Sequence, residues 1–127
     1  MIQFEPRMSQ TASKADEWVP ILPGTEAQVA LAIGRFVAEA KGGTVPKMFA
    51  AVDLEKVSKA SGVPMATLSR IAQTIVQAAK PIAVPGNAAL GMSNGLAVAQ
   101  AVLALNAMAG NFGQPGGVSL SPLAPLE

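Results

Sequence analysis

Three short, mainly hydrophobic segments, each followed within two residues by a proline, constrain the fold of this chain most strongly. The segments cover residues 2–4, 18–22 and 82–84. Because a residue before proline is pushed into extended backbone, each segment is a predicted strand. The segment at 82–84 is wholly apolar, which is typical of a strand buried on both faces of a parallel sheet. A further strand is predicted at residues 118–120.

Between these segments, apolar residues recur with the period of an α-helix. Thr25 and Gln28 have the spacing of a capping box, and Asp53 and Pro64 are typical first-turn residues of two more helices. The last stretch is apolar nearly all round and is predicted to be buried. Helices are therefore expected over residues 25–41, 53–62, 64–80 and 96–109, with loops at 44–52 and 86–95.

Strands that alternate with helices predict an α/β fold with a parallel sheet. A few short strands with about four helices are too little for a whole doubly wound, Rossmann-like domain. We therefore interpret residues 1–127 as a single α/β domain or as a fragment of a larger one.

Composition excludes several kinds of chemistry. The chain has no Cys and no His, so it lacks a disulfide, an Fe–S or thiolate zinc ligand, and an imidazole base. No catalytic residue and no metal ligand is predicted. Nine Lys and Arg residues against eight Asp and Glu residues give a net charge of +1, which does not favour a nucleic-acid surface. The most apolar stretch, 96–109, is shorter than the ~20 residues of a membrane span.

Two features lie where strands of a parallel sheet end, which is where such sheets bind ligands. Glu5 follows the first strand and is either an acceptor for ribose hydroxyl groups or a solvated acid. Gly24, Thr25 and Glu26 form a turn into a helix. This turn either binds a ligand, with the Glu26 carboxylate accepting from a guanine edge, or simply caps the helix.

Several other polar, glycine and aromatic residues can be explained by packing or local hydrogen bonds as well as by ligand binding. Three glycines in 86–95 permit close backbone approach to a ligand or tight packing. Asn106 and Gln100 lie on the apolar helix and need hydrogen-bond partners wherever they are buried. Trp18 is interpreted as a core or interface anchor.

Two ordered sets of motifs resemble a known family. The first set contains Phe4-Glu5-Pro6-Arg7, Thr11-Ala12, Ala15-Asp16 and Pro23-Gly24-Thr25-Glu26. The second contains Leu105-Asn106-Ala107 and Gly110-Asn111-Phe112-Gly113-Gln114-Pro115-Gly116-Gly117. In this order they resemble the molybdopterin oxidoreductases, the dimethyl sulfoxide reductase family, over essentially the whole chain.

The resemblance implies that the chain is an internal, Rossmann-like segment of a large subunit and is not catalytic alone. In that family the region contacts one of two molybdopterin guanine dinucleotides. Glu5 would then lie near the nucleotide ribose, and Gly24, Thr25 and Glu26 would hold the guanine. The sequence departs from the family pattern at residues 87–91, where many catalytic members have Gln near the pterin.

The resemblance also implies partners and a location. The partners would be the remaining domains of the large subunit and an iron–sulfur electron-transfer subunit, in the bacterial periplasm or in a membrane-associated complex. The block also resembles the iron–sulfur, molybdopterin-like large subunit of the quinol-oxidising alternative complex III, where the fold serves as a scaffold without molybdenum cofactor. Apolar surface at 96–109 and near Trp18 is expected to make the isolated chain self-associate.

Overall fold

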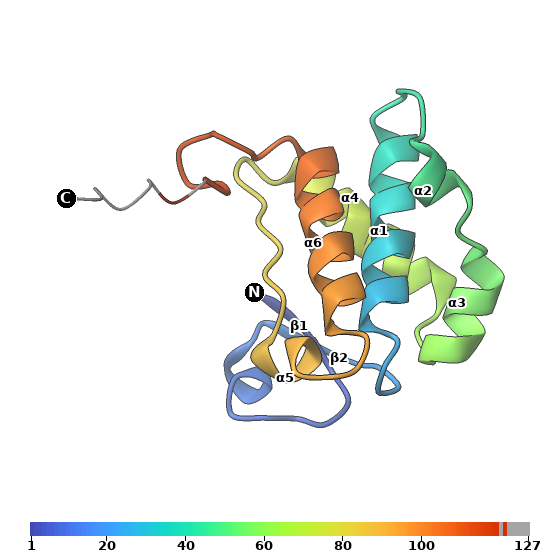
Figure 1. Cartoon of the computed structure of the whole chain (residues 1–127), viewed down its shortest axis with the longest axis vertical. Coiled ribbons are helices and arrows are strands. Elements are labelled where there is room, and N and C mark those ends of the chain that lie inside the picture. Colours follow the sequence, from blue (N-terminus) through green and yellow to red (C-terminus); the bar gives the residue numbers. More distant parts are fainter. Residues whose placement is uncertain (120, 122–127) are drawn as a thin grey trace.

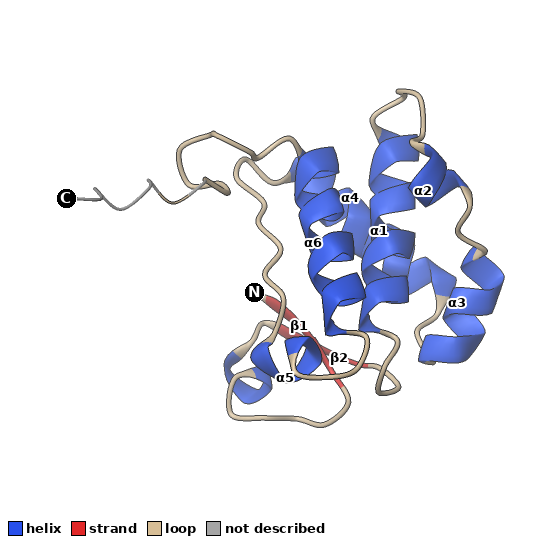
Figure 2. Ribbon diagram, in the orientation of Figure 1, coloured by secondary structure: helices blue, strands red, loops and turns tan. Residues whose placement is uncertain are grey.

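A bundle of helices packs on a small two-stranded parallel sheet, which lies at one end of the bundle, in the computed structural model, which describes residues 1–119 and 121 (Figures 1 and 2). This arrangement confirms the predicted α/β class. In chain order the elements of the described residues are β1 Ile2–Glu5, the 3-10 turn η1 Ala12–Lys14, β2 Glu17–Pro20, α1 Glu26–Ala40, α2 Lys47–Ala50, α3 Leu54–Ser61, α4 Met65–Gln77, α5 Asn87–Leu90 and α6 Gly95–Ala109.

The sheet consists of β1 and β2, which pair in parallel from Ile2 opposite Glu17 to Glu5 opposite Pro20. The polar connection between the strands contains η1, whose Ala12 is buried. Val19 and the half-buried Phe4 pack on the helices. The predicted strands at 2–4 and 18–22 are thus confirmed, with bounds shifted by one or two residues.

Helix α1 is the centre of the molecule and packs against α2, α3, α4 and α6. One of its faces joins a cluster with the sheet, α3 and α4, in which Val37 and Leu68 are fully buried. Another face meets α6 through Ala27, Ala30 and Ala101. These small side chains let the two helix backbones approach closely, so α1 and α6 lie side by side along their length (Figure 1).

The predicted strand at 82–84 is wrong, because no ladder forms there among the described residues. The segment instead runs alongside α6 and is held by one side chain. Asn106 Oδ1 accepts from Ala83 N at 2.9 Å, and Asn106 Nδ2 donates to Ala83 O at 2.8 Å. The buried amide thereby replaces a neighbouring strand on one edge of the segment.

Several helix predictions also need correction. Short helices, α2 and α5, occupy segments expected to be loops. Helix α2 forms because Phe49 inserts under α1 and is 1% exposed. Helix α4 ends at Gln77 rather than near residue 80. By contrast, Asp53 caps α3 by accepting from Lys56 N at 3.0 Å, as predicted.

Helix α6 is not buried on all sides. Leu96 is 73% exposed and Leu103 49% exposed, so one apolar face is open to solvent. The expected burial is therefore wrong, whereas the expected exposed apolar surface is present. Within the described residues no helix is both long and apolar enough to cross a membrane.

The predicted strand at 118–120 is represented by one parallel bridge, between Phe112 and Val118. Its last residue, Leu120, lies outside the described residues. The bridge closes the loop that follows α6, since Gly113 N also donates to Val118 O at 2.9 Å.

Candidate functional site

The sequence-predicted site residues lie at one edge of the sheet. Glu5 ends β1 opposite Pro20, and the turn that leads from β2 into α1 contains Gly24 and Thr25. Carboxyl ends of parallel strands meet at the same edge. The structure thus brings the two features to a common edge, although no hydrogen bond joins Glu5 to the turn in the part of the chain that it describes.

Glu5 organises the turn that follows β1. Its Oε1 accepts from Ser9 N at 3.2 Å and from the Ser9 hydroxyl. Ser9 Oγ in turn accepts from Ala12 N at 3.2 Å. The Glu5 carbonyl accepts from Trp18 Nε1 at 3.1 Å, so Trp18 anchors the sheet edge. One carboxylate oxygen of Glu5 therefore has a structural role.

The turn before α1 depends on the backbone conformation of Gly24. Its φ is +83°, and no atom lies within 4 Å of the position a Cβ would occupy. A glycine is needed there because the backbone is left-handed, not because a neighbour approaches. Thr25 stands at the N-cap, but its hydroxyl donates to Leu22 O at 2.6 Å. The predicted capping box is therefore not formed.

Glu26 is the least satisfied residue of this edge. It is half-buried at the first position of α1, and its Oε2 is covered without a hydrogen-bond partner. An unpaired covered acceptor costs about 1–3 kcal/mol, more when charged. The helix dipole offsets part of this cost. What the oxygen lacks is an N–H or O–H donor.

Sequence reasoning missed Asn94, which ties the start of α6 to this turn. Asn94 Nδ2 donates to Gly24 O at 3.0 Å. The next residue, Gly95, admits no side chain, because a Cβ would lie 2.1 Å from Leu90 O. The glycines of 86–95 thus include one required by tight packing. An Asn-Gly pair just before the apolar stretch was the available signal.

An ion pair lies at the other end of the sheet. The N-terminal ammonium of Met1 lowers the pKa of Asp16 through a hydrogen bond and its charge. That pair lies at the amino ends of the strands, opposite Glu5. No group of three or more acidic side chains capable of holding a metal occurs in the described residues.

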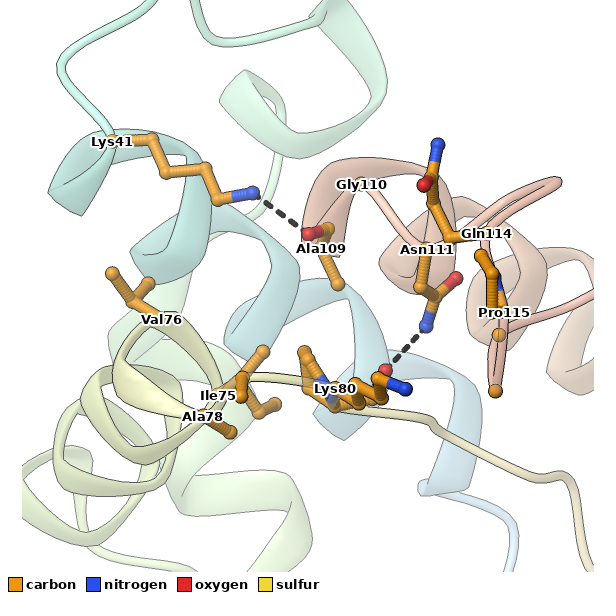
Figure 3. Close-up of a pocket in the computed structure, with 14 residues that line it drawn as sticks. Lys41, Ile75, Val76, Ala78, Lys80, Ala109, Gly110, Asn111, Gln114 and Pro115 are labelled. Atoms are coloured by element: carbon orange, nitrogen blue, oxygen red, sulfur yellow. Dashed lines mark hydrogen bonds between the residues drawn. The ribbon is translucent and has the colours of Figure 1, made fainter.

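A pocket of about 270 Å³ lies at the other end of the helices (Figure 3). The carboxyl ends of α1, α4 and α6 and the loop after α6 surround it. Lys41 Nζ donates to Met108 O at 2.7 Å and to Ala109 O at 2.9 Å, which ties the ends of α1 and α6 together. Asn111 Nδ2 donates to Pro81 O at 2.6 Å. None of the predicted site residues lines this pocket.

Comparison with known proteins gives two relationships. The chain is 31% identical over 126 residues to the "Menaquinone reductase, molybdopterin-binding-like subunit" of Nitratidesulfovibrio vulgaris (strain Hildenborough). The match covers 94% of this chain and 18% of that subunit. No protein-family model matches the sequence.

The second relationship is structural. Acetylene hydratase from Pelobacter acetylenicus matches with a TM-score of 0.78 at 20% sequence identity. This match covers 92% of the chain and 18% of the hydratase. The sequence match to a molybdopterin-binding-like subunit confirms the predicted resemblance to the molybdopterin oxidoreductase family, and the structural match shows a shared fold. The chain spans less than a fifth of each relative.

Proposed function

We propose that this chain is a segment of a molybdopterin-dependent oxidoreductase large subunit and helps to bind the guanine dinucleotide part of the cofactor. It is not catalytic alone. The proposal rests on similarity to a subunit described as molybdopterin-binding-like and on the edge formed by Glu5, Gly24, Thr25 and Glu26.

The observation that carries the nucleotide role is the covered, unpartnered Oε2 of Glu26. A guanine edge presents two adjacent N–H donors, at N1 and at the exocyclic amine, and a carboxylate accepts both. Rotation of the half-buried side chain would present both oxygens to such a base. Ser9 donates to one carboxylate oxygen of Glu5. The other oxygen would therefore accept from the ribose hydroxyl groups.

When bound in the longer protein, the cofactor would supply the redox chemistry. The residues of this chain would hold the nucleotide end. Gly24 would give the turn its shape, and the Thr25 hydroxyl, which donates to Leu22 O, keeps an oxygen able to accept. The partners proposed on the same basis are the remaining domains of the large subunit and an iron–sulfur subunit, in the periplasm or a membrane-associated complex.

A second candidate is a cofactor-free scaffold in a quinone-linked electron-transfer complex. The observation that favours it is the name of the similar subunit, a part of menaquinone reductase described as molybdopterin-binding-like. In this case the strand-end turn would serve packing alone. Glu26 would then only complement the α1 dipole.

Titration calorimetry of the 127-residue chain with GDP distinguishes the two candidates. We expect GDP to bind and Glu26→Ala to weaken binding about 10- to 100-fold, because hydrogen bonds to a charged group contribute about 1.5–3 kcal/mol. ADP should bind more weakly than GDP, since adenine lacks the paired donors of the guanine edge.

Glu55→Ala is the matched control. Glu55 is an exposed acid in the first turn of α3, as Glu26 is an acid in the first turn of α1. Its replacement should leave GDP affinity unchanged. Absence of binding at millimolar GDP, or equal binding by Glu26→Ala, would contradict the nucleotide role and favour the scaffold.

A further inference from the structure

Asn94 occupies the N-cap position of α6, but its side chain does not cap that helix. An asparagine at this position usually accepts a hydrogen bond from a backbone N–H of the first helical turn. Asn94 makes no such bond. Its Nδ2 instead donates to Gly24 O at 3.0 Å, across 70 positions of the chain. The amide therefore serves the turn before α1 rather than its own helix.

The carbonyl of Gly24 has no other partner in the part of the chain that the structure describes. Gly24 adopts a left-handed φ of +83°, and the Thr25 hydroxyl donates to Leu22 O instead of capping α1. The contacts inside the turn thus fix Thr25 relative to Leu22 and leave the carbonyl of Gly24 to Asn94. Because glycine has a wide range of backbone conformations, this carbonyl could rotate if it lost its donor.

The start of α6 can hold this turn because it is itself packed on two sides. Gly95 lies so close to Leu90 O that there is no room for a side chain. Val98, one turn into α6, is buried in the same cluster as Ala27 of α1. The two helices lie side by side and begin at the same end of the bundle (Figure 1). The amide thus reaches the turn from a firmly packed position.

We propose that Asn94 is a positioning residue for the nucleotide edge, an inference that rests on the proposed function. By holding the Gly24 carbonyl, its amide sets the direction of the turn and therefore where the Glu26 carboxylate points. That direction matters because two donors of one guanine edge must meet the two carboxylate oxygens at once. Hydrogen bonds weaken steeply with misalignment, so a rotation of the turn would weaken the paired contact.

Inosine diphosphate (IDP) separates positioning from overall stability, because its base keeps the N1–H of guanine but lacks the exocyclic amine. In titration calorimetry the 127-residue chain should bind GDP about tenfold more tightly than IDP. Asn94→Ala should weaken GDP binding about three- to tenfold and IDP binding less, so that the preference for GDP falls. Asn94→Asp keeps the shape of the side chain without its donor at pH 7, and it should lose the same preference.

Asn106→Ala is the matched control. Asn106 is also an asparagine of α6 whose amide holds a main-chain segment, but its bonds go to Ala83 and not to the turn. Its replacement lowers the stability of the chain. A smaller folded fraction weakens GDP and IDP binding by the same factor, so this variant should keep the preference for GDP.

Three outcomes would overturn the proposal, and they differ in what else they overturn. If both Asn94 variants keep the GDP affinity and the preference for GDP, Asn94 does not position the turn, although the nucleotide role stands. If both variants lose GDP and IDP affinity equally, the amide only stabilises the fold. If the wild-type chain binds neither nucleotide, or binds both equally, the proposed guanine contact fails and the positioning role fails with it.

Discussion

Asn106 shows how much a single side chain contributes to this fold. It is 2% exposed and makes two hydrogen bonds to Ala83. Its Oδ1 also accepts from Asn111 Nδ2 at 2.9 Å. The amide therefore joins α6, the segment 82–84 and the loop after α6. Sequence reasoning foresaw that a buried Asn106 needs a partner, but not that the partner is a main chain 23 residues away.

Replacing Asn106 with Ala should destabilise the chain by about 2–4 kcal/mol, since it leaves the N–H and the C=O of Ala83 without partners and removes one of the two hydrogen bonds that Asn111 Nδ2 donates. Urea unfolding followed by circular dichroism measures the change. Gln100→Ala is the control, because Gln100 is exposed on the same helix, and it should alter the unfolding free energy by less than about 0.5 kcal/mol. Equal effects of the two substitutions would show that the hydrogen bonds from Asn106 to Ala83 do not stabilise the fold.

At the scale of elements, small residues decide which helices can touch. Gly34 in α1 faces the buried ring of Phe49 in α2, and a Cβ there would lie 2.3 Å from Phe49 Cε1. The alanines between α1 and α6 have the same effect along that contact. Helix α2 thus depends on a long-range fit and not on a local signal. This explains why its segment was predicted to be a loop.

The contact predicts that Gly34→Ala destabilises the chain by about 1–3 kcal/mol through overpacking, although Ala favours helix by up to about 1 kcal/mol over Gly. Thermal and urea unfolding measure whether the free energy of unfolding falls or rises. Gly86→Ala is the control: its φ is −74° and its Cβ position is open, so it should be neutral or slightly stabilising. If Gly34→Ala instead raises the free energy of unfolding, α2 can move to make room for the added methyl group, and the prediction is wrong.

At the scale of the whole molecule, α1 joins the two apolar clusters. One contains the sheet, α3 and α4, and the other contains the contact with α6. Lys41 adds a link between the ends of α1 and α6. Neither cluster can lose α1 and stay buried, so the two should unfold together.

The single tryptophan tests this cooperativity. Trp18 lies in β2 and reports on the sheet through its bond to Glu5 O, whereas far-ultraviolet circular dichroism reports mainly on the helices. Urea unfolding curves from the two signals should coincide in midpoint and slope. A fluorescence transition at clearly lower urea would mean that the sheet edge, with Glu5 and the turn before α1, melts separately.

Much of the local structure followed from the sequence. Periodicity located α1, α3, α4 and α6, and Asp53 and Gly62 marked the ends of α3. The motifs identified the resemblance that the comparisons confirmed. Glu5 and Glu26 were both expected at one edge, because the carboxyl ends of parallel strands lie at the same edge of a sheet. These inferences succeeded because they depend on neighbours within about one helical turn or on the direction of a strand.

Tertiary structure decided what local signals do not contain. A strand exists only where another strand lies beside it, and at 82–84 a side-chain amide takes that place. Burial of α6 depends on what covers each face, so an apolar sequence still left Leu96 and Leu103 open. The tie from Asn94 to Gly24 joins residues 70 positions apart. The sequence by itself thus determined the two paired strands, the four longer helices and the candidate edge. The packing of distant segments determined the short helices α2 and α5, the conformation of 82–84, and which polar groups have partners.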